Sequence, residues 1–205
     1  MKGNISVNSE INELVRYKTG EGKQNSHAYL NRKYGLAIRQ GFYFEGIMIS
    51  YNLVEDRLIA LLHYAGVLSR DSDKLYVTKR TKQSIRKLLG KTEKQKIIIY
   101  NIETKLNILE AFIKSDYWDE YVLTVRELLA KTHCTDELCL LIDKCRKWKE
   151  VRNKYVHGLA NKSPESVEKM AETIADEGKQ IARRLDNCVG RFSNKNNIRK
   201  IFKIQ

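Results

Sequence analysis

Residues 138–157 read LCLLIDKCRKWKEVRNKYVH, and this stretch decides which kind of fold the chain is expected to adopt. Apolar side chains recur in it at steps of three and four, at Leu138, Leu141, Cys145 and Trp148. That spacing puts them on one face of an α-helix. Arg152 and Tyr155 continue the series, so Arg152 falls where a core residue is expected. Because a guanidinium is costly on an apolar face, Arg152 must be paired or must face a groove or a partner chain.

Asn153 and His157 stand beside Arg152 near the end of this predicted helix. Asn153 and His157 are four residues apart and therefore share one face, one turn apart. Arg152 and His157 are five residues apart, which is about 140° around an ideal helix. They therefore meet only through the long Arg152 side chain, or where the helix loosens near Gly158.

The segment EVRNKYVH, residues 150–157, resembles the motif of the HEPN family of small helical domains, many of which are ribonucleases. An arginine and a histidine separated by four residues form a common pattern. The resemblance rests on Arg152 and Asn153 followed by His157, late in a predicted helix of a basic, helical chain. It implies an all-α bundle of about five to seven helices, with long antiparallel helices over roughly residues 36 to 190.

The resemblance also implies a mechanism that needs no metal and no cofactor. Two protomers pair as a homodimer so that both copies of the motif line one cleft, and RNA is cut when its own 2′-hydroxyl attacks the adjacent phosphate. His157 is then the proton-transfer residue, since imidazole changes charge near neutral pH. Arg152 holds the phosphate and stabilises the negative charge of the transition state. Asn153 orients the histidine or contacts the phosphate.

Other interpretations of the same residues remain open. In one, Arg152 pairs with Glu150 or another carboxylate as a structural bridge, and His157 caps the helix through its last carbonyl groups. Some HEPN domains are non-catalytic, so the chain is alternatively an RNA-binding or assembly module. A third interpretation is a helical adaptor that binds a protein partner and no nucleic acid.

The residues around the histidine bear on the biological role, for which the resemblance suggests toxin activity, host defence or stress response. In HEPN toxins that pair with a nucleotidyltransferase antitoxin, a tyrosine stands two residues after the histidine, and here that position is Leu159. Tyr155 precedes the histidine and does not replace that tyrosine. The departure puts this particular pairing in doubt, while a cognate inhibitor or antitoxin stays among the partners that the resemblance implies.

The chain has a formal net charge of +13 with clustered cations, which favours a polyanionic partner such as RNA. The motif helix holds one cluster, in which the candidate RNA-binding residues are Arg146, Lys147, Lys149 and Lys154. Further clusters cover residues 79–91 and 195–203. A run of charge is more often a solvated helix face, so the agreement of charge with motif carries the prediction. A membrane surface is disfavoured because no strong apolar face accompanies the basic helices.

Another long helix is predicted over residues 36–67, where apolar residues recur at helical spacing from Phe44 to Leu62. In HEPN proteins the first long helix packs beside the motif helix and often supplies a polar side chain to the cleft. Glu55 is the favoured candidate to orient Arg152, and the others are Asp56 and Asn52. The alternative is that Glu55 is a carboxylate facing solvent.

The remaining helices are predicted over residues 79–89, 93–114, 117–131, 136–158 and 164–189. Ser163 and Pro164 suit the start of the last helix, and Gly190 suits its end. Residues 97–100 have the propensity of a short strand, but no second strand is evident. The expected organisation is a polar extension over residues 1–26, one helical domain over residues 27–190 and a basic tail over residues 191–205.

Composition predicts a soluble, cytoplasmic protein. The first residues are mostly polar, without the pattern of a signal peptide, and the apolar region at residues 58–68 is too short to span a bilayer. No Cys-x2-Cys pair occurs, so reduced thiols in a cytosolic core are expected for Cys134, Cys139, Cys145 and Cys188. Metal binding by these cysteines with His133 is the less favoured alternative.

Overall fold

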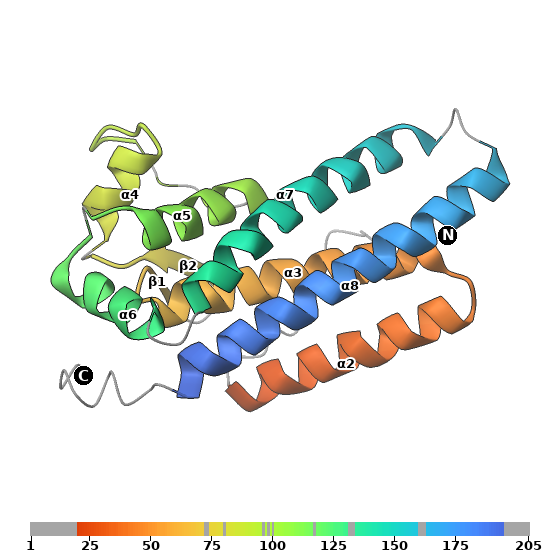
Figure 1. Cartoon of the computed structure of the whole chain (residues 1–205), viewed down its shortest axis with the longest axis horizontal. Helices are drawn as coiled ribbons and strands as arrows, with labels where there is room; N and C mark the ends of the chain where they lie inside the picture. The colour runs from red at the N-terminus through yellow and green to blue at the C-terminus, as the bar shows by residue number, and fades with distance from the viewer. Residues whose placement is uncertain are drawn as a thin grey trace, which may run out of the picture.

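The computed structural model describes residues 20–71, 74–79, 81–95, 97, 99, 101–116, 118–130, 134–159 and 163–194. This part of the chain forms seven α-helices and one short hairpin (Figure 1). The helices are α2 (Gly20–Arg39), α3 (Tyr43–Tyr64), α4 (Lys82–Leu88), α5 (Ile102–Lys114), α6 (Glu120–Ala130), α7 (Cys134–His157) and α8 (Pro164–Asn194). The expected all-α class is confirmed, and none of these helices is long and apolar enough to cross a membrane.

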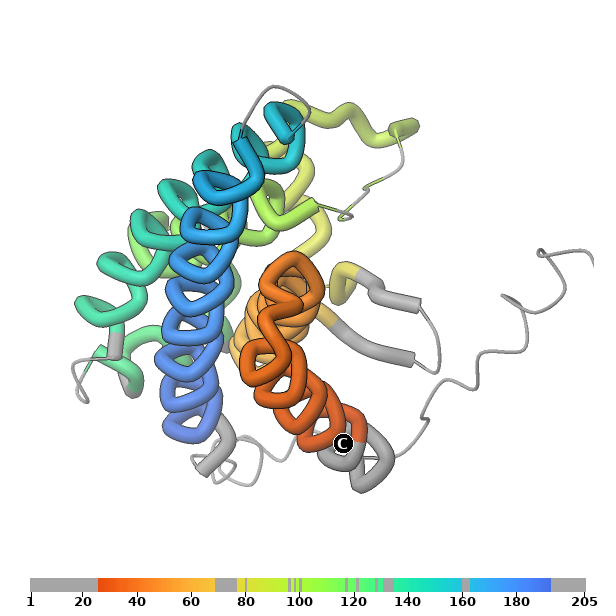
Figure 2. The backbone as a smooth tube through the Cα atoms, turned by 90° about the vertical axis from the view of Figure 1, so that its right-hand side faces the viewer, coloured from red at the N-terminus to blue at the C-terminus, as the bar shows by residue number. Residues whose placement is uncertain are grey.

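Helix α3 runs through the middle of the molecule, and the other long helices pack around it. α8 lies along α3, α7 lies on α8, and α2 packs against α3 (Figures 1 and 2). The short helices α4, α5 and α6 gather with the hairpin toward one end (Figure 1). α5 packs against both α3 and α7, so the motif helix is held between α5 and α8.

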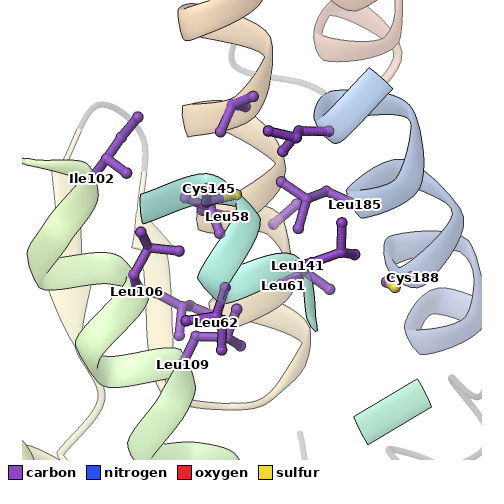
Figure 3. Packing of buried hydrophobic residues seen from close by; sticks show 14 of the residues in the cluster. Leu58, Leu61, Leu62, Ile102, Leu106, Leu109, Leu141, Cys145, Leu185 and Cys188 are labelled. Atoms are coloured by element: carbon purple, nitrogen blue, oxygen red, sulfur yellow. The ribbon is translucent and has the colours of Figure 1, made fainter. Parts of the chain in front are cut away.

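The core forms where the apolar faces of α3, α5, α7 and α8 meet (Figure 3). Its buried side chains include Leu58, Leu61 and Leu62 of α3, Ile102, Leu106 and Leu109 of α5, Leu141 and Cys145 of α7, and Leu185 and Cys188 of α8. Burying a large aliphatic side chain contributes about 1.5–3 kcal/mol relative to leaving it exposed. Four helices from distant parts of the sequence therefore stabilise one another through this core.

A tight turn at Gly41 makes the prediction of one continuous helix over residues 36–67 wrong, because it separates α2 from α3. Gly41 has a φ of 75°, a left-handed conformation that glycine adopts without strain. Its N–H donates to Ile38 O at 3.1 Å, and Phe42 N–H donates to Ala37 O at 2.8 Å. These two bonds close the end of α2 in a Schellman motif. The reversal lets α2 fold back onto α3.

The region before α5 also differs from expectation. α5 begins at Ile102 and not at residue 93, because Asn101 caps it by accepting from Thr104 N–H at 2.7 Å. Residues 97 and 99 lie in no strand, while residues 98 and 100 lie outside the described residues. The strands that do form are β1 (Leu68–Asp71) and β2 (Lys74–Val77), which pair antiparallel. They have no counterpart among the predicted elements because each is only four residues long.

Helix α8 starts where the sequence predicts and ends later. It begins at Pro164, and Ser163 Oγ accepts from Ser166 N–H at 3.4 Å. It then continues through Gly190 to Asn194, since Gly190 does not adopt a positive φ. The predicted domain limits at residues 27 and 190 thus both fall inside helices, α2 and α8. Residues 1–19 of the predicted extension and 195–205 of the predicted tail lie outside the described residues.

Candidate functional site at the end of α7

The face of α7 that the sequence predicts to be buried is confirmed, and Arg152 lies within it. The residues of this face that are at most 2% exposed are Leu138, Leu141, Cys145, Trp148 and Tyr155. Arg152, in contrast, is half-buried. α7 ends at His157, and Gly158 N–H donates to Lys154 O and Tyr155 O, each at 3.1 Å. The helix therefore stays regular up to His157, without the loosening that would bring Arg152 and His157 together.

The Arg152 guanidinium is held by three neighbours. Its Cζ lies 4.6 Å from the centre of the Tyr51 ring on α3, a cation–π contact. Its Nη1 donates to Asn153 Oδ1 at 3.2 Å, and its Nη2 lies 3.5 Å from Met48 Sδ. The Nε is buried and has no hydrogen-bond partner within the described part of the chain. Asn153 therefore contacts Arg152 and not His157.

Arg152 lacks the carboxylate partner that several other half-buried arginines have. Three of these form ion pairs of 2.6 to 2.8 Å: Arg57 with Asp186, Arg126 with Asp116, and Arg146 with Glu110. Among the described residues, no Asp or Glu forms an ion pair with Arg152, and Glu150, the expected bridge partner, is exposed. The remaining N–H groups of Arg152 are thus available to an anion from outside the chain.

Tyr51 is itself supported by Trp148 and Gly178. The Tyr51 ring packs on Trp148, with ring centres 6.3 Å apart and planes tilted by 34°. Trp148 Nε1 donates to Ile174 O on α8 at 2.8 Å, and the indole is buried. Gly178 makes room for it, because a Cβ there would lie 2.5 Å from Trp148 Cζ2. Three helices, α3, α7 and α8, thus fix the position of the ring under Arg152.

Glu55 lies one turn after Tyr51 on α3 but binds Lys105, not Arg152. Its Oε1 accepts from the buried Lys105 Nζ at 2.7 Å, and within the described residues it forms no hydrogen bond with Arg152. Burial raises the pKa of Tyr51, Glu55 raises it further, and Arg152 opposes both effects. The other two candidates to orient Arg152 are also engaged elsewhere: Asn52 donates to Met48 O and Asp56 accepts from Arg57. Direct orientation of Arg152 thus comes from Asn153 and Tyr51.

His157 is exposed at the last turn of α7. In the region that the structure describes, it forms no hydrogen bond or ion pair with Arg152 and no hydrogen bond with the last carbonyl groups of the helix. Because α7 is regular here, Arg152 and His157 point about 140° apart. One protomer alone therefore does not direct both side chains toward one point.

The four candidate RNA-binding cations separate into two pairs. Arg146 donates to Glu103 at 3.1 Å and to Glu110 at 2.6 Å, and Lys149 also binds Glu103. The hydrogen bond from Lys149 is the largest cause that lowers the pKa of Glu103. Arg146 and Lys149 therefore already pair with carboxylates of α5, and RNA binding by these two residues stays a prediction. Lys147 and Lys154 are exposed and lie on another side of α7.

Large apolar side chains are exposed near Arg152, at the beginning of α3. Phe42 is 57% exposed, Phe44 46% and Met48 41%. Beside them lies an open, mostly apolar pocket of about 390 Å³ between the turn at Gly41, the end of α7 and the start of α8. Its lining includes Phe42, Phe44, Tyr155, Val167 and Ala171. Such a grouping of exposed apolar side chains is typical of a surface that another molecule covers.

The cysteines offer a weak case for metal chemistry. Cys145 and Cys188 are buried and Cys139 is half-buried, while His133 and the side chain of Cys134 lie outside what the structure describes. Burial raises the pKa of Cys145 to about 12, which keeps its thiol protonated. Among the described side chains, no group of three or more His, Cys, Asp and Glu has the geometry to hold a metal ion.

Neither a family model, nor a curated protein, nor a solved structure matches this chain. Sequence reasoning identifies Arg152, Asn153 and His157, and it misses Tyr51 and Met48. Tyr51 follows Phe44 by seven residues and Met48 follows it by four, the spacing of one helix face, so this periodicity is the signal that points to both.

Proposed function

We propose that this protein is a metal-independent RNA endonuclease that works as a homodimer, with Arg152 and His157 as its central residues. One observation carries the proposal: the half-buried Arg152 guanidinium rests on Tyr51 and has no carboxylate partner among the described residues. A phosphodiester group supplies the negative charge that this position lacks. The net charge of +13 and the exposed lysines of α7, Lys147 and Lys154, favour a polyanion such as RNA over a small anion.

In the proposed reaction the 2′-hydroxyl of the RNA attacks the adjacent phosphorus. The bond from phosphorus to the 5′-oxygen breaks, which leaves a 2′,3′-cyclic phosphate on one product and a 5′-hydroxyl on the other. His157 takes part in the proton transfers, and Arg152 stabilises the charge that develops on the phosphate oxygens. Asn153 keeps one edge of the guanidinium in place. DNA, which lacks the 2′-hydroxyl, is not a substrate for this chemistry.

The proposal includes a dimer because one chain directs its two central residues about 140° apart. In a symmetric dimer, Arg152 of one protomer meets His157 of the partner subunit across the cleft. The exposed Phe42, Phe44 and Met48 beside Arg152 form an apolar surface suited to this contact. When two protomers pair about a two-fold axis, this apolar surface of one protomer faces the same surface of the other.

The test is cleavage of a labelled single-stranded RNA in excess EDTA by the native protein. Arg152→Ala and His157→Ala are each expected to lower turnover by about 10²-fold or more. The products should carry 2′,3′-cyclic phosphate ends, and an RNA with one 2′-deoxy nucleotide should resist cleavage at that nucleotide. Arg183→Ala, which removes an exposed cation on α8, is the matched control and should cleave normally.

Two results would overturn the proposed function. One is full activity in either Arg152→Ala or His157→Ala, with folding verified by circular dichroism. The other is a well-folded native dimer that cuts no RNA across varied single-stranded and structured substrates.

A second candidate function is a non-catalytic RNA-binding or assembly module. It is favoured by the same 140° divergence of Arg152 and His157, because binding a phosphate through Arg152 needs no histidine nearby. RNA affinity that depends on Arg152 but not on His157, without cleavage, distinguishes this candidate. The biological role that fits the nuclease is toxin activity, host defence or stress response. The test is to express the native chain and the Arg152→Ala variant in growing cells. Only the native chain should arrest growth.

A further inference from the structure

We infer that Tyr51 is the positioning residue for Arg152: its ring holds the guanidinium in place so that the free N–H groups meet an incoming phosphate. The inference rests on the proposed function for the identity of the anion. The geometry that supports it stands independently, in the 4.6 Å between Arg152 Cζ and the Tyr51 ring centre and in the contacts to Asn153 and Met48.

These contacts leave Arg152 with a defined set of donors. The Tyr51 ring covers one face of the guanidinium. Nη1 donates one hydrogen to Asn153 Oδ1, and Nη2 contacts only the weak sulfur acceptor of Met48. Nη1 and Nη2 each carry a further hydrogen at the guanidinium edge, where phosphates bind. Tyr51 therefore directs Arg152 without competing for that edge.

The Tyr51 ring is itself fixed, which makes it an effective support. The ring packs on Trp148. The Trp148 indole donates a hydrogen bond to Ile174 O, and its edge lies directly against Gly178. A free arginine loses much rotational freedom when it binds a ligand. An arginine that already rests on an immobile ring has lost most of that freedom before the phosphate arrives, so binding and transition-state stabilisation cost less.

The aromatic ring, and not the hydroxyl group, is the functional part of Tyr51. Arg152 contacts the ring face, and no hydrogen bond joins Arg152 to the Tyr51 hydroxyl in the described part of the structure. Burial raises the pKa of Tyr51, so the ring stays neutral beside the cation at ordinary pH. Phenylalanine should therefore replace Tyr51, whereas leucine, which is apolar but not aromatic, should not.

The first test is nuclear magnetic resonance of the Arg152 Nε–Hε group in the full chain without RNA, assigned with Arg152→Lys. A ring below the guanidinium and a buried Nε predict an upfield-shifted, slowly exchanging signal in the native protein. Tyr51→Phe should keep this signal, and Tyr51→Leu should move it to the position of exposed arginines. A native signal already at that position would overturn the inference, whatever the enzymatic activity.

The second test measures function with the same variants. Tyr51→Leu should lower kcat by about tenfold or more, as displacement of a catalytic group does, with a smaller change in KM. Its affinity for a single-stranded DNA of the same sequence, a probe that is not cut, should fall by about three- to tenfold. Tyr51→Phe should stay within about threefold of the native protein in both measurements. Equal losses in Tyr51→Phe and Tyr51→Leu would contradict a role for the ring.

Tyr64→Leu is the matched control, because Tyr64 is also half-buried on α3 but meets the edge of His63, with ring centres 5.6 Å apart. It should leave the Arg152 signal, kcat and DNA affinity unchanged. The nuclease activity and the positioning role of Tyr51 can fail separately. If the native protein cuts no RNA but the Arg152 signal and the DNA affinity follow the Tyr51 series, the nuclease fails and the positioning role holds. If cleavage needs Arg152 but both Tyr51 variants are native-like, the positioning role fails and the nuclease holds.

Discussion

Gly178 on α8 lies directly against Trp148 on α7, where an added Cβ would come within 2.5 Å of the indole Cζ2. The same Cβ would lie 2.6 Å from Ser50 Oγ on α3. Contacts this short do not occur in folded proteins, so three helices meet here only because residue 178 has no side chain. Trp148 supports Tyr51, and Tyr51 supports Arg152. A glycine on one helix thereby sets the position of the proposed catalytic arginine on another.

Gly178→Ala is expected to destabilise the protein by about 1–3 kcal/mol, the usual cost of overpacking a close contact. The loss should appear even though alanine favours a helix over glycine by about 1 kcal/mol. Urea unfolding followed by circular dichroism measures it. Gly190→Ala, in the same helix with nothing within 4 Å of the added Cβ, is the control and should be stabilising. A Gly178→Ala variant as stable as Gly190→Ala would contradict the packing argument.

Mixing inactive variants tests whether the proposed cleft uses residues of both protomers. Arg152→Ala and His157→Ala should each be inactive, while their mixture after refolding together should recover about one quarter of native activity. Half of the dimers are then mixed, and each mixed dimer holds one intact Arg152 opposite one intact His157. A mixture that stays inactive, although mixed dimers are detected by mass spectrometry, would mean that each chain uses its own pair.

Lysines on the two sides of α7 should behave differently on substitution. Lys147→Ala and Lys154→Ala should weaken RNA binding and each reduce the slope of log affinity against log salt by about 1. Lys149→Ala should instead lower the urea midpoint and leave that slope unchanged, because Lys149 is bound to Glu103. Fluorescence anisotropy over a salt series separates these outcomes. A salt slope that changes only in Lys149→Ala would reverse the assignment of the two faces.

The contacts between α5 and α7 should make stability sensitive to acid. Hydrogen bonds from Lys149 and Arg146 hold the pKa of Glu103 below its ordinary value of 4.5. A carboxylate whose pKa is lower in the folded state stabilises the fold above its unfolded pKa, and this stabilisation disappears as pH falls through the folded value. The urea midpoint should therefore drop between about pH 5 and pH 3, and Glu103→Gln should show a smaller drop. An identical pH profile for both proteins would contradict a stabilising role for Glu103.

Local patterns explain why some elements were predictable. The apolar spacing from Leu138 to Tyr155 depends only on helix periodicity, so α7 and its buried face are confirmed. The start of α8 at Pro164 follows from capping chemistry in neighbouring residues. Gly41 and Asn101 carried equally local signals for a turn and a cap, but each stood inside or beside an apolar run whose periodicity suggested a longer helix.

The sequence by itself determined the helical class, the course of α7 and the positions of Arg152, Asn153 and His157 along it, because helix geometry follows from residues a few positions apart. Only the tertiary structure decided what each cation contacts. Arg152 meets Tyr51, Lys149 meets Glu103, and Lys105 meets Glu55. These partners lie some 50 to 100 residues away in sequence. Their pairing depends on how α3, α5 and α7 pack, and the apolar core, not the charges, sets that packing.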